Sequence, residues 1–297
     1  MPIGMNIYEQ DWDMVIVLDA CRTDALVEVS SEYEFIADVD EVTSLGSTSV
    51  EWIHNTFVEE YLDEIRSTSY VTANAFSDYV RDSGVNRLYT AETKGTIYET
   101  SDLAKKFVRN DTVGGAFGNF ELVNGSKLES SDSKKYYHPD IVTASAIKSS
   151  REKNNDRLIV HYMQPHAPYI SDAVERGYYE EHEEKPFQYL KNGGDRSTVW
   201  NAYIDNLRLV LDSVEVLLEN VDADRVVITA DHGELFGEWG LYSHIYGVPH
   251  PSLKKVPWAV TTAEDLHTTT PDEILESHDL ITGEERIEDR LSALGYK

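Results

Sequence analysis

The sequence has a single cysteine, few basic residues and no long apolar segment. Cys21 has no partner within the 297 residues, which excludes an internal disulfide. The 26 basic residues stand against 54 acidic ones, so the formal net charge is −28. Such a surface repels a phosphate backbone, and we expect no nucleic-acid partner. The longest apolar runs, 14–18 and 226–228, are far shorter than the roughly 20 residues that cross a bilayer, so we expect no membrane span.

The acidic residues make up about 18% of the chain and are spread along it rather than gathered in a tail. Only 13 residues are lysine. This composition is typical of halophilic proteins, because concentrated salt screens the repulsion between surface carboxylates. It predicts a halophilic protein from a salt-adapted source, such as a haloarchaeon. The other interpretation is an acidic surface that binds a basic partner.

Length and composition predict a folded protein with one large domain. Hydrophobic residues make up 41% of the chain and aromatic residues 10%, which is enough to build a core. The N-terminal segment has no basic region followed by an apolar run, so we expect a cytoplasmic protein. We predict a single domain over 1–297, with an irregular cap-like excursion at about 86–137, where glycines interrupt the pattern. The acidic surface hides any apolar patch, so the sequence gives no oligomeric state.

Short apolar runs alternate with helical patterns along the chain. The runs 14–18, 157–163 and 224–234 are typical of buried parallel strands. This alternation predicts an α/β fold with a mostly parallel central sheet and helices on both faces. Further strands are predicted at 69–73 and 256–261, a loop at 171–196, and helices or turns at 22–30, 44–65, 77–84, 139–152, 198–221 and 284–297.

Carboxylate and imidazole side chains follow three of these strands. Asp19 follows the first, His166 the second, and Asp231 with His232 the third. In such sheets ligands bind outside the carboxyl ends of the strands, so this placement predicts a site there. Carboxylate plus imidazole suits Zn²⁺ or Mn²⁺, and more oxygen ligands would favour Mg²⁺ or Ca²⁺. A simpler interpretation of Asp19 is a helix N-cap.

Two further segments allow a structural and a chemical interpretation. In LGSTSVEW (45–52), Thr48 and Glu51 fit a capping box, although hydroxyls at a helix N-terminus also suit a bound oxyanion. In HYMQPHAPY (161–169), His161 lies inside the predicted strand and is interpreted as a core histidine. His166 lies between two prolines in the loop and is the better functional candidate.

Four features together resemble the alkaline phosphatase/sulfatase superfamily in its sulfatase-like branch. They are the strand ending in Asp19 with Arg22 after it, the glycine and hydroxyls at a helix start, the PHAPY loop, and ADHGELFGEWGLYSH (230–244). KKVPW (254–258) and the closing RLSALGYK are also similar to family segments. The resemblance covers almost the whole chain and thins between 86 and 137. It implies an alkaline phosphatase/sulfatase-like fold.

The resemblance also implies residue roles. Asp19, Asp231 and His232 would hold a divalent metal ion. The hydroxyl of Thr48, or of Ser47, would be the metal-activated nucleophile. Substrate phosphate or sulfate, or a second metal, would be held by His166 and His244, with His250 a weaker candidate. Arg22 would steady the nucleophile or the anion.

Two departures from the family narrow the expected activity. Sulfatases form formylglycine from Cys/Ser-x-Pro-x-Arg, whereas Ser47 to Glu51 lacks both the proline and the arginine. Sulfatases also show two adjacent aspartates on the first strand, whereas Ala20 follows Asp19. We therefore predict a metal-dependent hydrolase or transferase that acts on small-molecule or glycan phosphate or sulfate esters, with phosphate favoured. The alternative is a non-catalytic sulfatase-like protein that binds a glycan or a partner.

Overall fold

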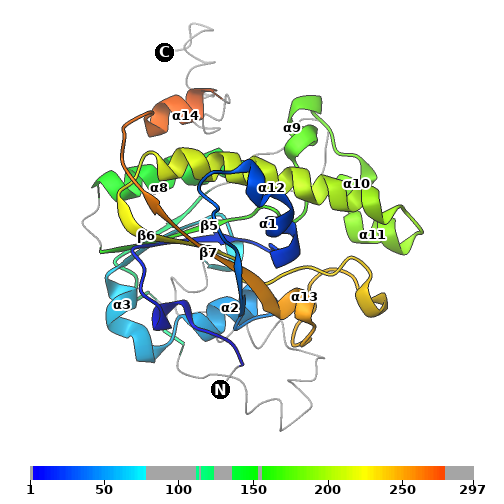
Figure 1. Cartoon of the computed structure of the whole chain (residues 1–297), viewed down its shortest axis with the longest axis horizontal. Coiled ribbons are helices and arrows are strands. Elements are labelled where there is room, and N and C mark those ends of the chain that lie inside the picture. Colours follow the sequence, from blue (N-terminus) through cyan, green and yellow to red (C-terminus); the bar gives the residue numbers. More distant parts are fainter. Residues whose placement is uncertain (1–2, 78–111, 114, 124–135, 153–155, 278–297) are drawn as a thin grey trace, which may run out of the picture.

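The computed structural model describes residues 3–77, 112–113, 115–123, 136–152 and 156–277. A seven-stranded sheet in the order β2-β7-β6-β1-β5-β3-β4 runs through the middle of the molecule (Figure 1). The strands are β1 (Met14–Leu18), β2 (Asp40–Thr43), β3 (Thr68–Thr72), β4 (Asn119–Leu122), β5 (Arg157–Tyr162), β6 (Ala223–Thr229) and β7 (Lys255–Ala263).

The sheet is mixed, which corrects the prediction of a mostly parallel one. β1 pairs in parallel with β5 and β6, and β3 pairs in parallel with β5 and β4. β7 runs antiparallel to both of its neighbours, β6 and β2. The apolar run at 256–261 predicted the strand that the structure shows as β7. A short apolar run does not indicate whether a strand is parallel or antiparallel to its neighbours.

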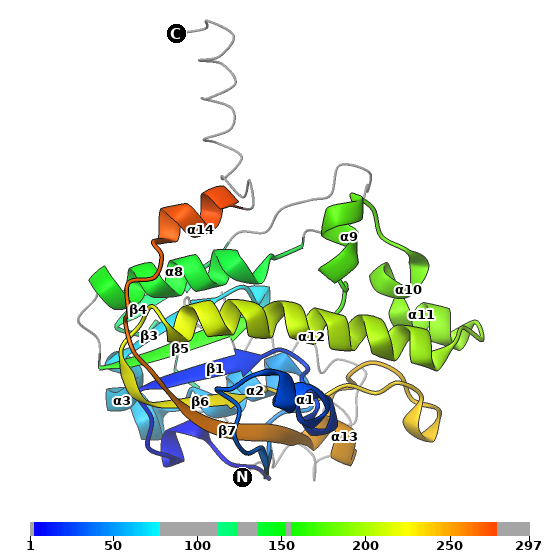
Figure 2. The ribbon, with the colours of Figure 1, turned by 45° about the horizontal axis from the view of Figure 1, so that its top comes forward.

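Helices cover both faces of the sheet, as predicted (Figure 2). The alternation of β1 shows why: Met14, Ile16 and Leu18 face one core cluster, and Val15 and Val17 face the other. The first face carries α1 (Thr23–Val29), α8 (Pro139–Glu152) and α12 (Arg196–Leu218), and the second carries α2 (Ser49–Thr56) and α3 (Leu62–Arg66).

Several predicted elements differ in extent from those observed. The helical pattern at 44–65 is divided between α2 and α3, because the chain leaves the helix at Phe57. The predicted loop at 171–196 contains three short helices, α9 (Ser171–Arg176), α10 (Glu181–Glu184) and α11 (Pro186–Lys191). The predicted helix at 284–297 and most of that at 77–84 lie outside the described residues. The remaining α-helices among the described residues are α13 (Pro251–Lys254) and α14 (Pro271–Ser277).

Part of the predicted excursion at 86–137 belongs to the sheet. β4 lies within it and extends the sheet beyond β3. The hydrophobic pattern of Asn119–Leu122 is too short to reveal a strand, which explains why the sequence did not predict it. Among the described helices, none combines the length and the apolar character needed to cross a lipid bilayer.

Candidate functional site

The carboxyl ends of β1, β5 and β6 bring polar side chains from distant parts of the chain together. Asp19 follows β1 directly, and Asp231 and His232 follow β6 after one residue. His166 lies in the loop after β5, where its backbone N–H donates to the carbonyl of Asp19 over 3.1 Å. The three adjacent strands are parallel, so these residues meet at one edge, as expected from their positions directly after the predicted strands.

Each of the two aspartates has one oxygen held by hydrogen bonds and one oxygen without a partner. Asp19 Oδ2 accepts from Asn74 Nδ2 over 2.8 Å. Asp231 Oδ1 accepts from the backbone N–H groups of Ala20 and His232. Asp19 Oδ1 and Asp231 Oδ2 are fully buried and have no hydrogen-bond partner. A buried carboxylate oxygen without a partner is costly, so both atoms need a cation or a donor.

His161 completes a buried cluster with these two aspartates, which we call the Asp19–Asp231–His161 cluster. Its Nδ1 lies 2.8 Å from the Tyr70 hydroxyl, which fixes the ring. Its Nε2 has no hydrogen-bond partner and lies 3.7 Å from Asp231 Oδ2. Three atoms, one from each residue, lie within 4.8 Å of one another. The sequence predicted a core histidine here, and the ring is fully buried, yet one of its nitrogens faces the two carboxylates.

His232 lies beside the same two carboxylates. Its Nδ1 is 2.7 Å from the carbonyl of Gly233, which can only accept, so Nδ1 carries the proton and Nε2 presents a lone pair. Nε2 lies 3.6 Å from Asp19 Oδ1 and 3.5 Å from Asp231 Oδ2. This arrangement fixes the tautomer that a metal-binding histidine needs.

The electrostatics of the cluster favour a bound cation. Burial, together with the charge of Asp231, raises the pKa of Asp19 well above its usual value. Burial lowers the pKa of His161 to about 4, so its imidazole is neutral. Within the described residues, no ion pair joins Asp19 or Asp231 to a lysine or arginine. The residues present therefore fit a divalent metal ion, because they offer buried oxygen and nitrogen atoms that lack other partners.

The N-terminus of α2 points three hydroxyl groups in three directions. Thr48 is the N-cap, and its hydroxyl accepts from the backbone N–H of Glu51 over 3.3 Å. The Ser47 hydroxyl is bonded to the Glu51 carboxylate and to the carbonyl of Ile245. Ser49 lies beside the Asp19–Asp231–His161 cluster. Its Oγ is 3.2 Å from His232 Nε2 and 3.4 Å from Asp19 Oδ2. The structure thus brings Ser49, rather than the two predicted hydroxyls, to the predicted metal ligands.

Two glycines allow the close backbone approaches on which the site depends. A Cβ on Gly46 would lie 2.4 Å from the backbone nitrogen of Trp52, in the first turn of α2. A Cβ on Gly233 would lie 2.1 Å from the carbonyl oxygen of Ser252. Gly233 also donates to the carbonyl of Leu253. Only glycine lets these segments pack against each other, so both positions fix the placement of the ligands.

His166, Glu234 and His244 form a second group next to the first. His244 Nδ1 lies 3.3 Å from both carboxylate oxygens of Glu234. The ring of His244 lies 5.1 Å from that of His166 and 4.6 Å from that of His232, between ring centres. Burial would lower the pKa of His244, but the Glu234 carboxylate raises it above its usual value. Burial and His244 lower the pKa of His166 to about 4.

Arg22 and His250, two other predicted candidates, contact neighbouring segments instead. The Arg22 guanidinium pairs with Asp24 and Glu238, each at 2.7 Å, and donates to the carbonyl of Glu234. It holds the segment after His232 in place. The His250 side chain caps α13 by accepting from the backbone N–H of Ser252.

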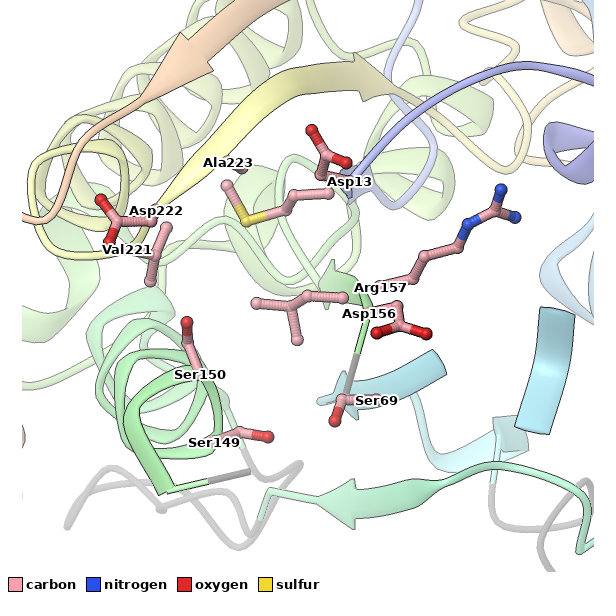
Figure 3. Close-up of a pocket in the computed structure, with 11 residues that line it drawn as sticks. Asp13, Ser69, Ser149, Ser150, Asp156, Arg157, Val221, Asp222 and Ala223 are labelled. Atoms are coloured by element: carbon pink, nitrogen blue, oxygen red, sulfur yellow. The ribbon is translucent and has the colours of Figure 1, made fainter. Parts of the chain in front are cut away.

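Two cavities differ in their relation to the site. One of about 330 Å³ borders His166 and is lined mainly by apolar and aromatic side chains, among them Tyr136, Met163 and Ile170. Another of about 70 Å³ lies at the opposite edge of the sheet (Figure 3). Its carboxylates come from Asp13, Asp156 and Asp222, at the amino ends of β1, β5 and β6. Only the first cavity adjoins the candidate ligands.

Four residues of the site were not predicted from the sequence: Ser49, Asn74, His161 and Glu234. Glu234 carried a signal, since it belongs to the Asp-His-Gly-Glu segment. Ser49 was hidden because a helix start places consecutive residues about 100° apart, so a one-residue shift changes the direction completely. Asn74 lies after β3, and no spacing in the sequence links it to Asp19.

Comparison of the sequence with protein-family models and with curated proteins finds no match. The fold, by contrast, is similar to that of solved structures. The soluble domain of lipooligosaccharide phosphoethanolamine transferase A from Neisseria meningitidis matches with a TM-score of 0.52 and 14% identity, over 90% of this chain and 78% of that one. This similarity shows that the two chains share a fold.

Two further solved structures are similar at lower scores. The periplasmic domain of a phosphoethanolamine transferase from Campylobacter jejuni has a TM-score of 0.46 and 13% identity, over 89% of this chain and 86% of that one. A lipoteichoic acid synthase from Listeria monocytogenes has a TM-score of 0.42 and 11% identity, over 84% of this chain and 64% of that one.

Proposed function

We propose that the protein is a metal-dependent hydrolase or transferase that acts on phosphate or sulfate esters, with phosphate favoured. The observation that carries this proposal is the position of Ser49. Its hydroxyl lies 3.2 Å from His232 Nε2 and 3.4 Å from Asp19 Oδ2, at the N-terminus of a helix. We assign Ser49 as the nucleophile, in place of the two hydroxyls expected from the sequence.

Asp19, Asp231 and His232 would hold a divalent metal ion, with His161 as a further ligand from β5. Two ligands of one ion with bonds of about 2.1 Å lie at most about 4.2 Å apart. His161 Nε2 and Asp231 Oδ2, at 3.7 Å, satisfy this limit. Three carboxylate or hydroxyl groups and two imidazoles suit Zn²⁺ or Mn²⁺, whereas Mg²⁺ or Ca²⁺ would rely on the oxygen atoms. The bound ion would lower the pKa of the Ser49 hydroxyl and neutralise ester oxygens.

In the reaction, Ser49 Oγ attacks the phosphorus atom of the ester. The Oγ–P bond forms as the hydroxyl proton passes to Asp19 Oδ2, 3.4 Å away, while the bond from phosphorus to the alcohol oxygen breaks and its electron pair leaves with that oxygen. The N-terminal N–H groups of α2 favour the negative charge of the transferred group, because the positive end of the helix dipole points at it. Water or a second alcohol then attacks the phosphoserine and gives its proton to the now neutral His244, while the Oγ–P bond breaks and Ser49 Oγ takes back the proton held by Asp19. These alternatives correspond to hydrolysis and transfer.

The second group would act on the leaving oxygen and on the anion. His244, whose pKa the Glu234 carboxylate raises, would donate a proton to the departing alkoxide, and its neighbour His166 would contact the anion. The cavity beside His166 would receive the alcohol part of the ester. Neither Ser47 nor Ser49 is followed by the proline and the arginine of the formylglycine segment, which argues against formylglycine chemistry and supports phosphate over sulfate.

Side-by-side turnover of 4-nitrophenyl phosphate and 4-nitrophenyl sulfate tests the proposal. Each would be measured in molar KCl with Mn²⁺, Zn²⁺, Mg²⁺ or Ca²⁺, for the unmodified protein and for Ser49→Ala and Asp231→Asn. We expect metal-dependent phosphate turnover that both substitutions abolish. A protein that binds metal but turns over neither ester in any condition, and binds a glycan instead, would support the non-catalytic alternative.

A further inference from the structure

One aromatic side chain near the site combines exposure with an unfavourable backbone conformation. Trp239 is 75% exposed, which is far from the buried state that its large apolar surface favours. Its φ of 53° and ψ of 21° place it in the left-handed region, which is unusual for a bulky residue. Strain of this kind persists only where the surrounding structure holds it, and it concentrates at functional sites.

Residues 234–244, which we call the Trp239 hairpin, hold this side chain at their tip. Phe236 and Tyr242 form an antiparallel bridge. Gly237 donates to the carbonyl of Leu241, and Gly237 and Gly240 both have positive φ angles, as a tight reversal requires. Figures 1 and 2 show this segment, in gold between β6 and α13, projecting past the sheet on the side of α10 and α11.

An ion-pair network fixes the tip. Glu238, next to Trp239, accepts from Arg22 over 2.7 Å and from Arg196 over 3.1 Å. Its other carboxylate oxygen accepts from the backbone N–H of Phe236. One side of the indole is supported by the His250 ring, with the ring centres 4.2 Å apart. The indole is therefore held in a defined orientation although it is exposed.

The base of the hairpin belongs to the candidate site. Glu234 and His244 are its two ends, and they lie 3.3 Å apart. Trp239 is five residues from each, so its backbone lies at most about 17 Å from them along an extended chain. One extended ligand can therefore contact both the base of the hairpin and the indole.

We propose that Trp239 stacks against a sugar ring of an oligosaccharide that carries the phosphate or sulfate ester. This inference rests on the proposed function for the ester and adds the class of substrate. The C–H groups on the face of a sugar ring are electron-poor and pack on the electron-rich indole face. Sugar hydroxyls and charged groups would meet polar side chains next to the hairpin, namely Arg196, with 56% of its side chain exposed, and Lys191, which lies over the Tyr242 ring.

The same surroundings argue against a lipid bilayer as the occupant. The sequence neighbours of Trp239 are Glu238 and Gly240, and no other described residue of the Trp239 hairpin is an exposed large apolar side chain.

Saccharide binding by the whole chain tests the proposal. Isothermal titration would use a phosphomannan-derived oligosaccharide, a heparin-derived hexasaccharide and maltohexaose, with the unmodified protein, Trp239→Ala and Trp239→Phe. All would carry Ser49→Ala so that the ester survives. We expect at least one charged saccharide to bind, with affinity at least tenfold weaker for Trp239→Ala and less reduced for Trp239→Phe. The matched control is Tyr178→Ala, which removes an aromatic ring that is 49% exposed and lies on a different segment. This substitution should change the affinity less than twofold.

The outcomes separate this inference from the proposed function. Absence of saccharide binding, or equal binding with and without Trp239, overturns the inference, whatever the turnover of 4-nitrophenyl phosphate. Trp239-dependent binding to phosphatidylcholine–phosphatidylglycerol vesicles instead of saccharides also overturns it. Trp239-dependent saccharide binding without metal binding or ester turnover would confirm the sugar contact and contradict the proposed function.

Discussion

The hydroxyl of Ser49 lies 3.2 Å from His232 Nε2, whereas the hydroxyl of Thr48, one residue earlier, caps α2. The two residues should therefore respond differently to truncation. We expect Ser49→Ala to lower turnover at least about 10³-fold with little change in stability, because it removes the nucleophile. We expect Thr48→Ala to lower the free energy of unfolding by about 1 kcal/mol while retaining turnover. Thermal unfolding and 4-nitrophenyl phosphate turnover of both variants check this, and the reverse pattern would assign the nucleophile to Thr48.

His161→Gln should weaken metal binding, because it removes the Nε2 atom that faces Asp231 Oδ2. We expect the dissociation constant for Zn²⁺ or Co²⁺ to rise by about 10- to 100-fold or more, and the visible spectrum of the Co²⁺ form to change. His182→Gln, in α10, is the matched control. If His161 is only a core histidine, the two variants will bind metal equally well.

Gly233→Ala should disrupt the site without removing any ligand. The added methyl group would meet the Ser252 carbonyl oxygen at 2.1 Å, so the segment that carries Asp231 and His232 must shift. We expect a loss of stability of about 1–3 kcal/mol and a marked loss of metal affinity. Gly177→Ala is the control, because no atom lies within 4 Å of a Cβ there, although its φ of 80° also disfavours alanine. Equal metal affinity in the two variants would contradict the role of Gly233.

Lys254→Met should stabilise the protein at neutral pH. Burial lowers the pKa of Lys254 from 10.5 to about 8, so the folded state binds its proton less tightly than the unfolded state. The free energy of unfolding therefore rises with pH between about 8 and 10.5. Below about pH 8 the buried charge of Lys254 lowers the free energy of unfolding by up to about 3 kcal/mol. Denaturant unfolding at pH 7 and pH 10 would measure this difference. Lys255→Met, at an exposed neighbour paired with Glu41, should show no such pH-dependent gain.

Salt should stabilise the fold. Exposed carboxylates repel one another over a screening length of about 10 Å in 0.1 M salt, and this length falls to about 3 Å in 1 M salt. With a net charge of −28, we expect the midpoint of thermal unfolding to rise by several degrees between 0.1 M and 2 M KCl. Sucrose at the same osmolality is the control for effects of added solute other than the screening of charge. A midpoint that falls or stays constant in KCl would contradict the halophilic interpretation.

The sequence predicted the central strands and the long helices because their patterns are long or strongly apolar. The run 14–18 became β1 with the same limits, and the pattern at 139–152 became α8. The edge strands β2 and β4 were missed, because four residues with mixed polarity give no periodic signal. The direction of β7 depends on how the chain returns to the sheet, and no local pattern specifies it.

The convergence of Asp19, Asp231 and His166 was predicted, because strand ends in an α/β sheet share an edge. The sequence could not predict which hydroxyl and which imidazole face the cluster. Ser49, rather than Thr48, enters it because the N-cap fixes the rotation of α2. His161 reads as a core residue in the sequence, and only the pairing of β5 with β1 brings it opposite Asp231.

The position of β1 in the middle of the sheet has a consequence for folding. β1 pairs with β5, which begins at Arg157, and with β6, which begins at Ala223. β1 therefore stays without both partner strands until more than half of the 297 residues have been synthesised. Contacts of such large sequence separation favour slow folding, because the loops must close before the pairing stabilises them. We expect refolding to be slower than for a helical protein of this size, and the metal ligands to assemble only as β1 and β6 pair.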